Sequence, residues 1–167
     1  GNAKIIYSCN LPGSVIKIYL TEIESLDNVK LPGSLKVLDL TDCTSIESLD
    51  NVKLPDNLEV LNLTDCTSIE SLDNVKLPNS LIELDLTGCS IESLDNVKLP
   101  DSLKDLYVIY TNIKSLANVK LPDNLETLDL TDCTNIKSLD NVKLPGSLKT
   151  LDLTDCTSIC LLYTSPS

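Results

Sequence analysis

LPGSLKVLDLTDCTSIESLDNVK, residues 31–53, is repeated with small changes along almost the whole chain. The copies begin at Leu11, Leu31, Leu54, Leu77, Leu99, Leu121 and Leu144. Their spacing of about 22 or 23 residues, after a shorter first unit, is typical of a solenoid in which each unit forms one coil and stacks on the next. We therefore expect about seven repeats over residues 11–159, a degenerate repeat remnant at 1–10, and a segment of a different kind at 160–167.

The spacing of the apolar residues changes within one unit. Leu38 and Leu40 are two positions apart, as in a strand, whereas the apolar residues that follow are three positions apart. We predict a short strand near Val37–Thr41, a turn over residues 42–45, and a return through a 3₁₀-like or irregular segment. An α-helix is not expected there, because Pro55 closes the segment after too few residues.

The repeated motif carries a family resemblance. The pattern LxxLxLxxCxxI at Leu35–Ile46 resembles the signature of leucine-rich repeats, and it recurs with edits through most of the chain. SIESL at residues 45–49, followed by Leu54-Pro55, is similar to the BspA-like subclass of bacterial and protist surface proteins. The resemblance implies a leucine-rich-repeat solenoid, an α/β-type superhelix that is here mostly β. It would have a curved parallel sheet of short strands on its concave face, with 3₁₀ or irregular segments on its convex face.

The amino-acid composition limits the fold and the kinds of partner that this chain can bind. Hydrophobic residues make up 42% of the chain, yet aromatic residues are only 3% and Phe, Trp and Met are absent. This suits thin, repeated layers of Leu, Ile and Val. The formal net charge of −12 repels nucleic acid and anionic lipid and favours a basic partner. The alternative is that the acidic residues only keep the surface of the protein soluble. Because no run of about 20 apolar residues occurs, we expect no membrane-spanning segment.

Five cysteines recur at one position of the unit, and a sixth copy has Thr111 there. They are Cys43, Cys66, Cys89, Cys133 and Cys156. We expect buried thiols that bond turn backbone, with disulfides and a metal site as the alternatives. The chain has no His, and a row of stacked residues does not form a tetrahedral site, so we expect neither a metal nor a cofactor. Cys9 and Cys160 lie outside this column.

Alternation along each predicted strand gives three outward columns. The first is Lys17, Val37, Val60, Glu83, Asp105, Thr127 and Thr150, the second is Tyr19, Asp39, Asn62, Asp85, Tyr107, Asp129 and Asp152, and the third is Thr21, Thr41, Thr64, Thr87, Ile109, Thr131 and Thr154. Stacked like charges cost stability unless something neutralises them. A basic protein surface or bound cations would do so, and screening by solvent and nearby lysines is the alternative.

One unit, Leu99–Lys120, departs from the others and would place Tyr107 and Ile109 on the open face among carboxylates. A Tyr ringed by polar groups is typical of an interaction hot spot, although drift within a decaying repeat explains it as simply. We therefore predict a partner-binding surface on the acidic concave face. Its expected contacts are Tyr107, Ile109, Asp85, Asp105 and Asp129, with Tyr19 and Asp39 as further members.

The expected function is that of a non-catalytic, monomeric protein–protein interaction scaffold with a basic protein partner. A cell-surface adhesion module for host protein or glycan is the main alternative. A polysaccharide hydrolase fragment and an ice-binding protein are minor ones. Catalysis is not expected, because a Ser or Cys nucleophile has no His base and no phosphate-binding glycine loop is present. Ice binding is not expected either, because it needs a regular array with little charge. The third outward column, which is otherwise Thr, is broken at Ile109.

The two ends of the chain suggest that it is a piece of a longer protein. It begins at Gly1 and contains no Met. The final CLLYTSPS, residues 160–167, resembles the read-through translation of a sequencing-library adapter, which would make the tail non-native and the chain a metagenomic fragment. The compartment stays open, because the cysteine column fits a reducing environment whereas the family resemblance implies a surface or secreted protein.

Overall fold

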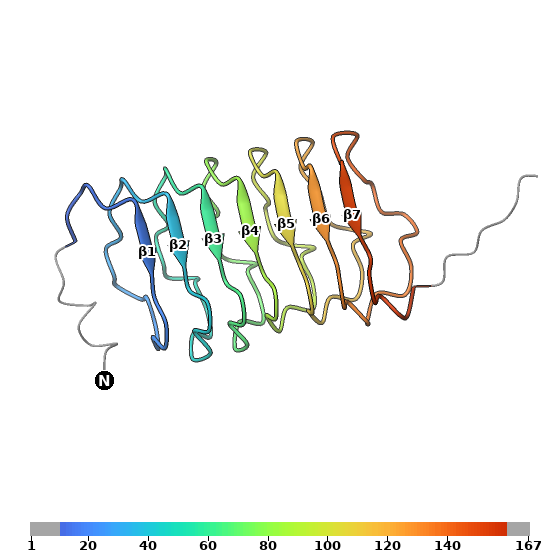
Figure 1. Ribbon diagram of the computed structural model, residues 1–167, viewed down its shortest axis with the longest axis horizontal. Helices are drawn as coiled ribbons and strands as arrows, with labels where there is room; N and C mark the ends of the chain where they lie inside the picture. The colour runs from blue at the N-terminus through green and yellow to red at the C-terminus, as the bar shows by residue number, and fades with distance from the viewer. Residues whose placement is uncertain (1–10, 160–167) are drawn as a thin grey trace, which may run out of the picture.

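The structure, a computed structural model, describes residues 11–159 of the chain. Its regular elements are the strands β1 (Lys17–Tyr19), β2 (Val37–Asp39), β3 (Val60–Asn62), β4 (Glu83–Asp85), β5 (Asp105–Tyr107), β6 (Thr127–Asp129) and β7 (Thr150–Asp152). They form one parallel sheet in the order β1 to β7, so each strand pairs with the strand of the next repeat (Figure 1). The predicted repeat solenoid is confirmed.

The middle residue of every strand points into the core. These residues are Ile18, Leu38, Leu61, Leu84, Leu106, Leu128 and Leu151, and consecutive members are register partners. From Leu38 to Leu128 they are fully buried, whereas the residues on either side of them are partly exposed. Alternation of side chains along a strand produces this pattern, so the predicted outward columns are confirmed within the strands.

The strands are shorter than predicted, because β2 ends at Asp39 and not at Thr41. The Leu40 N–H still bonds the carbonyl of Asn62 in the next coil, at 2.9 Å. The Thr41 N–H instead donates to Asp39 Oδ1, also at 2.9 Å. A side chain two residues back therefore takes the amide that would have continued the ladder, and the chain turns.

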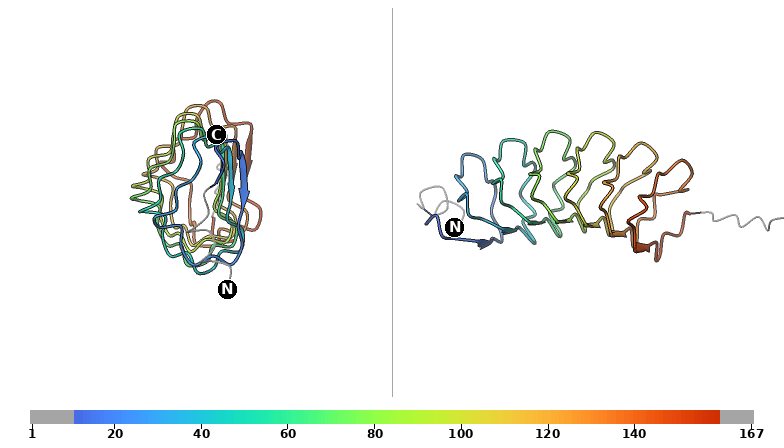
Figure 2. Two further views of the ribbon diagram at one scale, coloured as in Figure 1. Left: turned by 90° about the vertical axis from the view of Figure 1, so that its left-hand side faces the viewer. Right: turned by 90° about the horizontal axis from the view of Figure 1, so that it is seen from above.

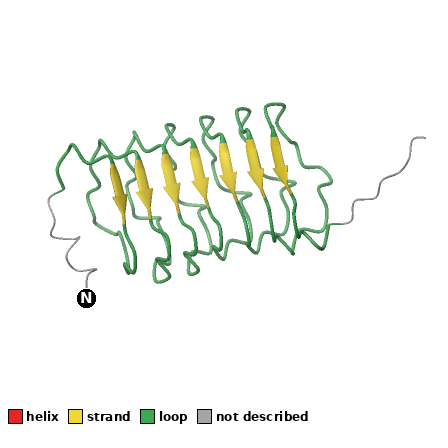
Figure 3. Ribbon diagram, viewed as in Figure 1, coloured by secondary structure: helices red, strands yellow, loops and turns green. Residues whose placement is uncertain are grey.

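The return segments are irregular in the described part of the chain, where neither α- nor 3₁₀-helix occurs (Figure 3). Ile46, Leu49 and Val52 are buried at their three-residue spacing, as predicted. The strands line the inner side of a gently curved row of coils, and the return segments line the outer side (Figure 2). Residues 11–159 contain no helix with the length and apolar character needed to cross a bilayer.

The cysteine column is confirmed as a row of buried, free thiols. Each Sγ lies 2.9–3.4 Å from a backbone carbonyl oxygen of the preceding coil, as in the Cys66 bond to Leu40 O at 3.1 Å. Burial raises the pKa of Cys66 and of Cys89 to about 12. Thr111 keeps the column polar, because its hydroxyl donates to Val108 O at 3.0 Å.

The last coil is less covered than the coils in the middle of the solenoid. Leu144 is 42% exposed, whereas its counterpart Leu121 is buried, and Leu151 and Ile159 are only partly buried. The predictions for residues 1–10 and 160–167, including those for Cys9 and Cys160, lie outside the described residues.

Candidate functional site

The outward positions of β4, β5 and β6 gather acid around one tyrosine. Tyr107 is the register partner of Asp85 on one side and of Asp129 on the other. Glu83 and Asp105 are partners in the neighbouring column. Adjacent strands lie about 4.8 Å apart, so these side chains share one small area of the sheet. We call this area the β4–β6 face.

The β4–β6 face contains most of the residues predicted as contacts. Asp85, Asp105, Tyr107 and Asp129 lie on it, and Ile109 follows two residues after Tyr107, at the edge where the coil turns. Tyr19 and Asp39 are not part of it, because β1 and β2 form the other end of the sheet (Figure 1). They are register partners of each other, and Tyr19 is 64% exposed.

The aspartates of the second column have a structural role that the repeat pattern does not reveal. Asp85 Oδ1 accepts the Thr87 N–H and Asp129 Oδ1 accepts the Thr131 N–H, each at 2.9 Å. Each carboxylate thereby ends its own strand in the way described for β2. Asn62 does the same with a neutral oxygen, so the turn requires an acceptor and not a charge.

The charges of the β4–β6 face act on one another. Burial, and then the charges of Asp105 and Asp85, raise the pKa of Glu83. Burial also raises the pKa of Tyr107, with further contributions from Asp105, Glu83 and the two flanking aspartates. After burial, the remaining contributions to both raised pKa values come from neighbouring carboxylates, so negative charge is concentrated at this surface. A cation placed here would relieve that repulsion.

Several lysines in the described residues are already paired beside the sheet or behind it. The ion pairs found in residues 11–159 are Lys36–Glu59 at 2.9 Å, Lys114–Glu92 at 2.7 Å and Lys149–Glu126 at 2.6 Å. Each joins neighbouring coils at exposed positions, so each contributes little to stability. The outward positions of β4, β5 and β6 themselves carry four carboxylates and no lysine.

A second tyrosine, missing from the predicted contacts, stands at the edge of the β4–β6 face. Tyr110 is 71% exposed and adopts φ 52°. The other coils have Glu22, Asp or Gly at this turn position, also with positive φ. The sequence signal is therefore a Tyr in a column that otherwise has acidic residues and one Gly. The left-handed conformation and the exposure come only from the structure.

Comparison with known proteins decides the family. The sequence profile described as "BspA type Leucine rich repeat region" matches residues 2–108 and 42–160, with six copies of the repeat. The chain belongs to the BspA-type leucine-rich-repeat family. This family and fold are typical of protein-interaction or adhesion modules, which are as a rule non-catalytic scaffolds. None of the curated proteins matches this chain.

One solved structure similar to this leucine-rich-repeat chain is titled "The crystal structure of CroV588 a novel circular LRR protein structure". The identity is 33% and the TM-score is 0.64. The match covers 84% of this chain and 21% of that chain, so this chain spans about a fifth of the other protein's length. The likeness supports the repeat fold and its stacked coils.

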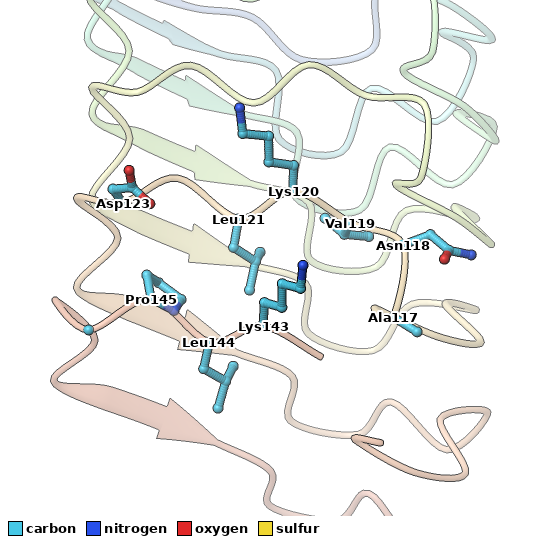
Figure 4. Close-up of a pocket in the computed structure, with 10 residues that line it drawn as sticks. Ala117, Asn118, Val119, Lys120, Leu121, Asp123, Lys143, Leu144 and Pro145 are labelled. Atoms are coloured by element: carbon cyan, nitrogen blue, oxygen red, sulfur yellow. The ribbon is translucent and has the colours of Figure 1, made fainter. Parts of the chain in front are cut away.

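The β4–β6 face is open surface, whereas a cavity of about 600 Å³ lies among the return segments. That cavity is lined by aliphatic side chains, backbone, Lys120 and Lys143 from successive repeats, and Asp123 (Figure 4). No residue of the β4–β6 face lines it. Within residues 11–159, no group of three or more Cys, Asp or Glu side chains could hold a metal ion.

The raised pKa of Glu83 predicts a pH dependence of stability. The folded state holds this proton more tightly than the unfolded state, so the resulting stabilisation is present at low pH and is lost as pH rises from the ordinary value of 4.5 through the folded pKa. Glu83→Gln should therefore melt like the parent at about pH 3.5 and above it at about pH 7. Thermal melts by circular dichroism would measure this, and a constant difference across the range would contradict it.

The backbone of Tyr110 predicts a stabilising substitution. A bulky residue at positive φ is strained, whereas Asn tolerates this conformation, as Asn28 does at φ 63°. Tyr110→Asn should raise the free energy of unfolding by about 1 kcal/mol. Urea denaturation would measure the change, with Asp132→Asn at the same turn position as a control expected to change little. Loss of stability in Tyr110→Asn would show that the ring stabilises the fold.

Proposed function

We propose that this protein is a non-catalytic interaction module that binds a basic segment of a protein partner on the β4–β6 face. The observation that carries the proposal is the position of Tyr107 between Asp85 and Asp129, with Glu83 and Asp105 in the next column. The charges attract and orient a basic segment. The partly exposed ring supplies the contact area that hot spots require.

The chemistry of the face favours Lys and Arg over other ligands. A cationic side chain laid across β4–β6 meets carboxylates on both sides of Tyr107 and the face of the ring itself. Ile109, two residues after Tyr107, offers an apolar contact beside this charge. An extended peptide could run along the sheet and meet these groups in turn, because the strands repeat at about 4.8 Å.

Binding accounts for the carboxylates better than catalysis does. Asp85 and Asp129 occupy a repeated position and accept backbone N–H groups, so their presence follows from the turn. Enzyme sites are as a rule concave and enclose their substrate, whereas these groups lie on an open face away from the cavity. Membership of a family of scaffolds supports the same choice.

Tyr107→Ala tests the proposal. The probe is a fluorescent octapeptide of alternating lysine and glycine, and its binding is followed by fluorescence anisotropy. The parent protein should bind it at low salt and release it at about 0.5 M salt. Tyr107→Ala should weaken binding about fivefold through loss of the ring contact, with little change in the melting temperature.

Tyr19→Ala is the matched control, because Tyr19 occupies the same column at the far end of the sheet. It should bind the peptide like the parent. A second control is the octapeptide of alternating glutamate and glycine, which should not bind. Equal affinity of the parent for both peptides, or equal losses in the two tyrosine variants, would refute the proposal.

A further inference from the structure

The charge of the return segments changes sign along the solenoid. Seven residues precede each Leu-Pro from Leu31 onward, and in the first four of these stretches one Glu, one Asp and one Lys give a formal charge of −1. Those stretches are residues 24–30, 47–53, 70–76 and 92–98. Residues 114–120 have two lysines and no acid, and residues 137–143 have two lysines and Asp140, so their charges are +2 and +1. We call these last two stretches the basic end.

An ion pair marks the boundary between the acidic stretches and the basic end. Lys114 Nζ lies 2.7 Å from Glu92 Oε2 in the preceding coil. Lys120 and Lys143 are exposed and take part in none of the ion pairs found in residues 11–159. Their charges are therefore available to a ligand.

The cavity of about 600 Å³ lies at the basic end, where Lys120 and Lys143 both line it (Figure 4). The corresponding cavities between earlier coils measure about 340, 240 and 80 Å³. Two lining positions lack a side chain that other coils have. Ala117 replaces the Asp of the other five stretches, and Gly146 stands where the preceding coil has Asp123. Both replacements remove bulk and negative charge from this cavity.

The lining suits a carboxylate attached to a sugar ring. The two lysines come from successive coils, about 4.8 Å apart, and the Lys143 side chain extends toward the coil of Lys120 (Figure 4). Asn118 and Asp123 offer an amide and a carboxylate to hydroxyl groups. Leu121 and the 42% exposed Leu144 supply apolar surface for the ring. The volume lies within the range of small-molecule sites.

The basic end favours a compact anion over a long acidic chain, because it is only two coils long. The four acidic stretches before it repel a chain of carboxylates that runs along the solenoid. The net charge of −12 also opposes general attraction of anions to this protein. A single carboxylate on a neutral body meets the two lysines without that repulsion.

We propose that the cavity at the basic end binds an acidic sugar, with its carboxylate at Lys120 and Lys143 and its ring against Leu121 and Leu144. This second site lies among the return segments and shares no residue with the β4–β6 face. It therefore does not rest on the proposed function. With both sites, one module holds a basic protein segment and an acidic glycan at the same time.

A nuclear magnetic resonance titration of the isotope-labelled protein with sodium glucuronate tests this site. Saturable chemical-shift changes should appear at the amides of Val119, Lys120 and Gly146. The dissociation constant should be on the order of millimolar, because both lysines are exposed. Sodium acetate carries the charge without the ring, and glucose carries the ring without the charge. Each should bind at least about fivefold more weakly than glucuronate.

Gly146→Asp gives the cavity the residue that the preceding coil has at Asp123. A Cβ at Gly146 meets nothing within 4 Å, so the variant should fold like the parent. Its added carboxylate should weaken glucuronate binding about fivefold. Gly33→Asp is the matched control, because it makes the same change at the same repeat position of a distant coil, also with nothing within 4 Å of the Cβ. It should bind glucuronate like the parent.

Three results would overturn the proposal. Equal affinity for acetate and glucuronate would show that the ring is not recognised. Equal losses in Gly146→Asp and Gly33→Asp would show that the effect is one of net charge and not of this cavity. A titration without saturable shifts at the cavity would show that no site exists there. None of these results bears on the lysine–glycine octapeptide, so the two proposals fail separately.

Discussion

Leu84→Ala is expected to lower the free energy of unfolding by about 3 kcal/mol. Leu84 is fully buried at the centre of β4, with Leu61 and Leu106 as its register partners in the adjacent coils. Truncation leaves a cavity in a layer one coil thick, and neighbouring coils depend on that layer for their own burial. The unfolding transition should therefore broaden as well as shift, since the chain is weakened at mid-length.

Urea denaturation followed by circular dichroism would measure this change. Ile82→Ala is the matched control, because Ile82 is an apolar residue two positions away that is 37% exposed. It should change the free energy of unfolding by less than about 1 kcal/mol. Similar losses in the two variants would contradict the placement of Leu84 in the core.

Removing three charges from the β4–β6 face should weaken binding of the lysine–glycine octapeptide about thirtyfold at low salt. The variant combines Glu83→Gln, Asp85→Asn and Asp129→Asn. Exposed ion pairs contribute up to about 1 kcal/mol each, and three together give about 2 kcal/mol. The fold should survive, because Asn62 shows that an amide oxygen replaces the carboxylate at the strand end.

A second triple variant changes the net charge equally on the other side of the molecule. It combines Asp50→Asn, Asp73→Asn and Asp95→Asn, which are exposed in the return segments. Loss of general attraction would weaken binding similarly in both variants, whereas a site on the β4–β6 face predicts a large loss in the first alone. Equal losses, measured by anisotropy at one salt concentration, would refute a localised site.

The stack of inward-facing leucines at the centres of the strands could be predicted from the sequence. The repeat period and the alternation of side chains along each strand fix their positions. Once each Leu-Pro begins a coil, Leu38, Leu61 and Leu84 have nowhere to lie but one above another, and the register confirms this. The strand length could not be predicted in the same way. It depends on whether the Thr41 N–H bonds the next coil or the Asp39 side chain, a local competition that hydrophobic spacing does not express.

The candidate site was predicted in part. The columns placed Asp85, Tyr107 and Asp129 side by side, as the register has them. The columns give no weight to distance along the sheet, so they group Tyr19 with residues that lie three to five strands away. Tyr110 is absent from the predicted contacts because it lies outside the three outward columns. Its left-handed backbone conformation and its exposure come only from the structure.

The most direct test of the central claim is a nuclear magnetic resonance titration of the isotope-labelled protein with the lysine–glycine octapeptide. The account predicts saturable chemical-shift changes at Glu83, Asp85, Tyr107 and Asp129, with Tyr19 and the return-segment aspartates unaffected. Shifts spread evenly over acidic residues on both sides of the solenoid would contradict it, because the acid would then act only as a diffuse surface charge.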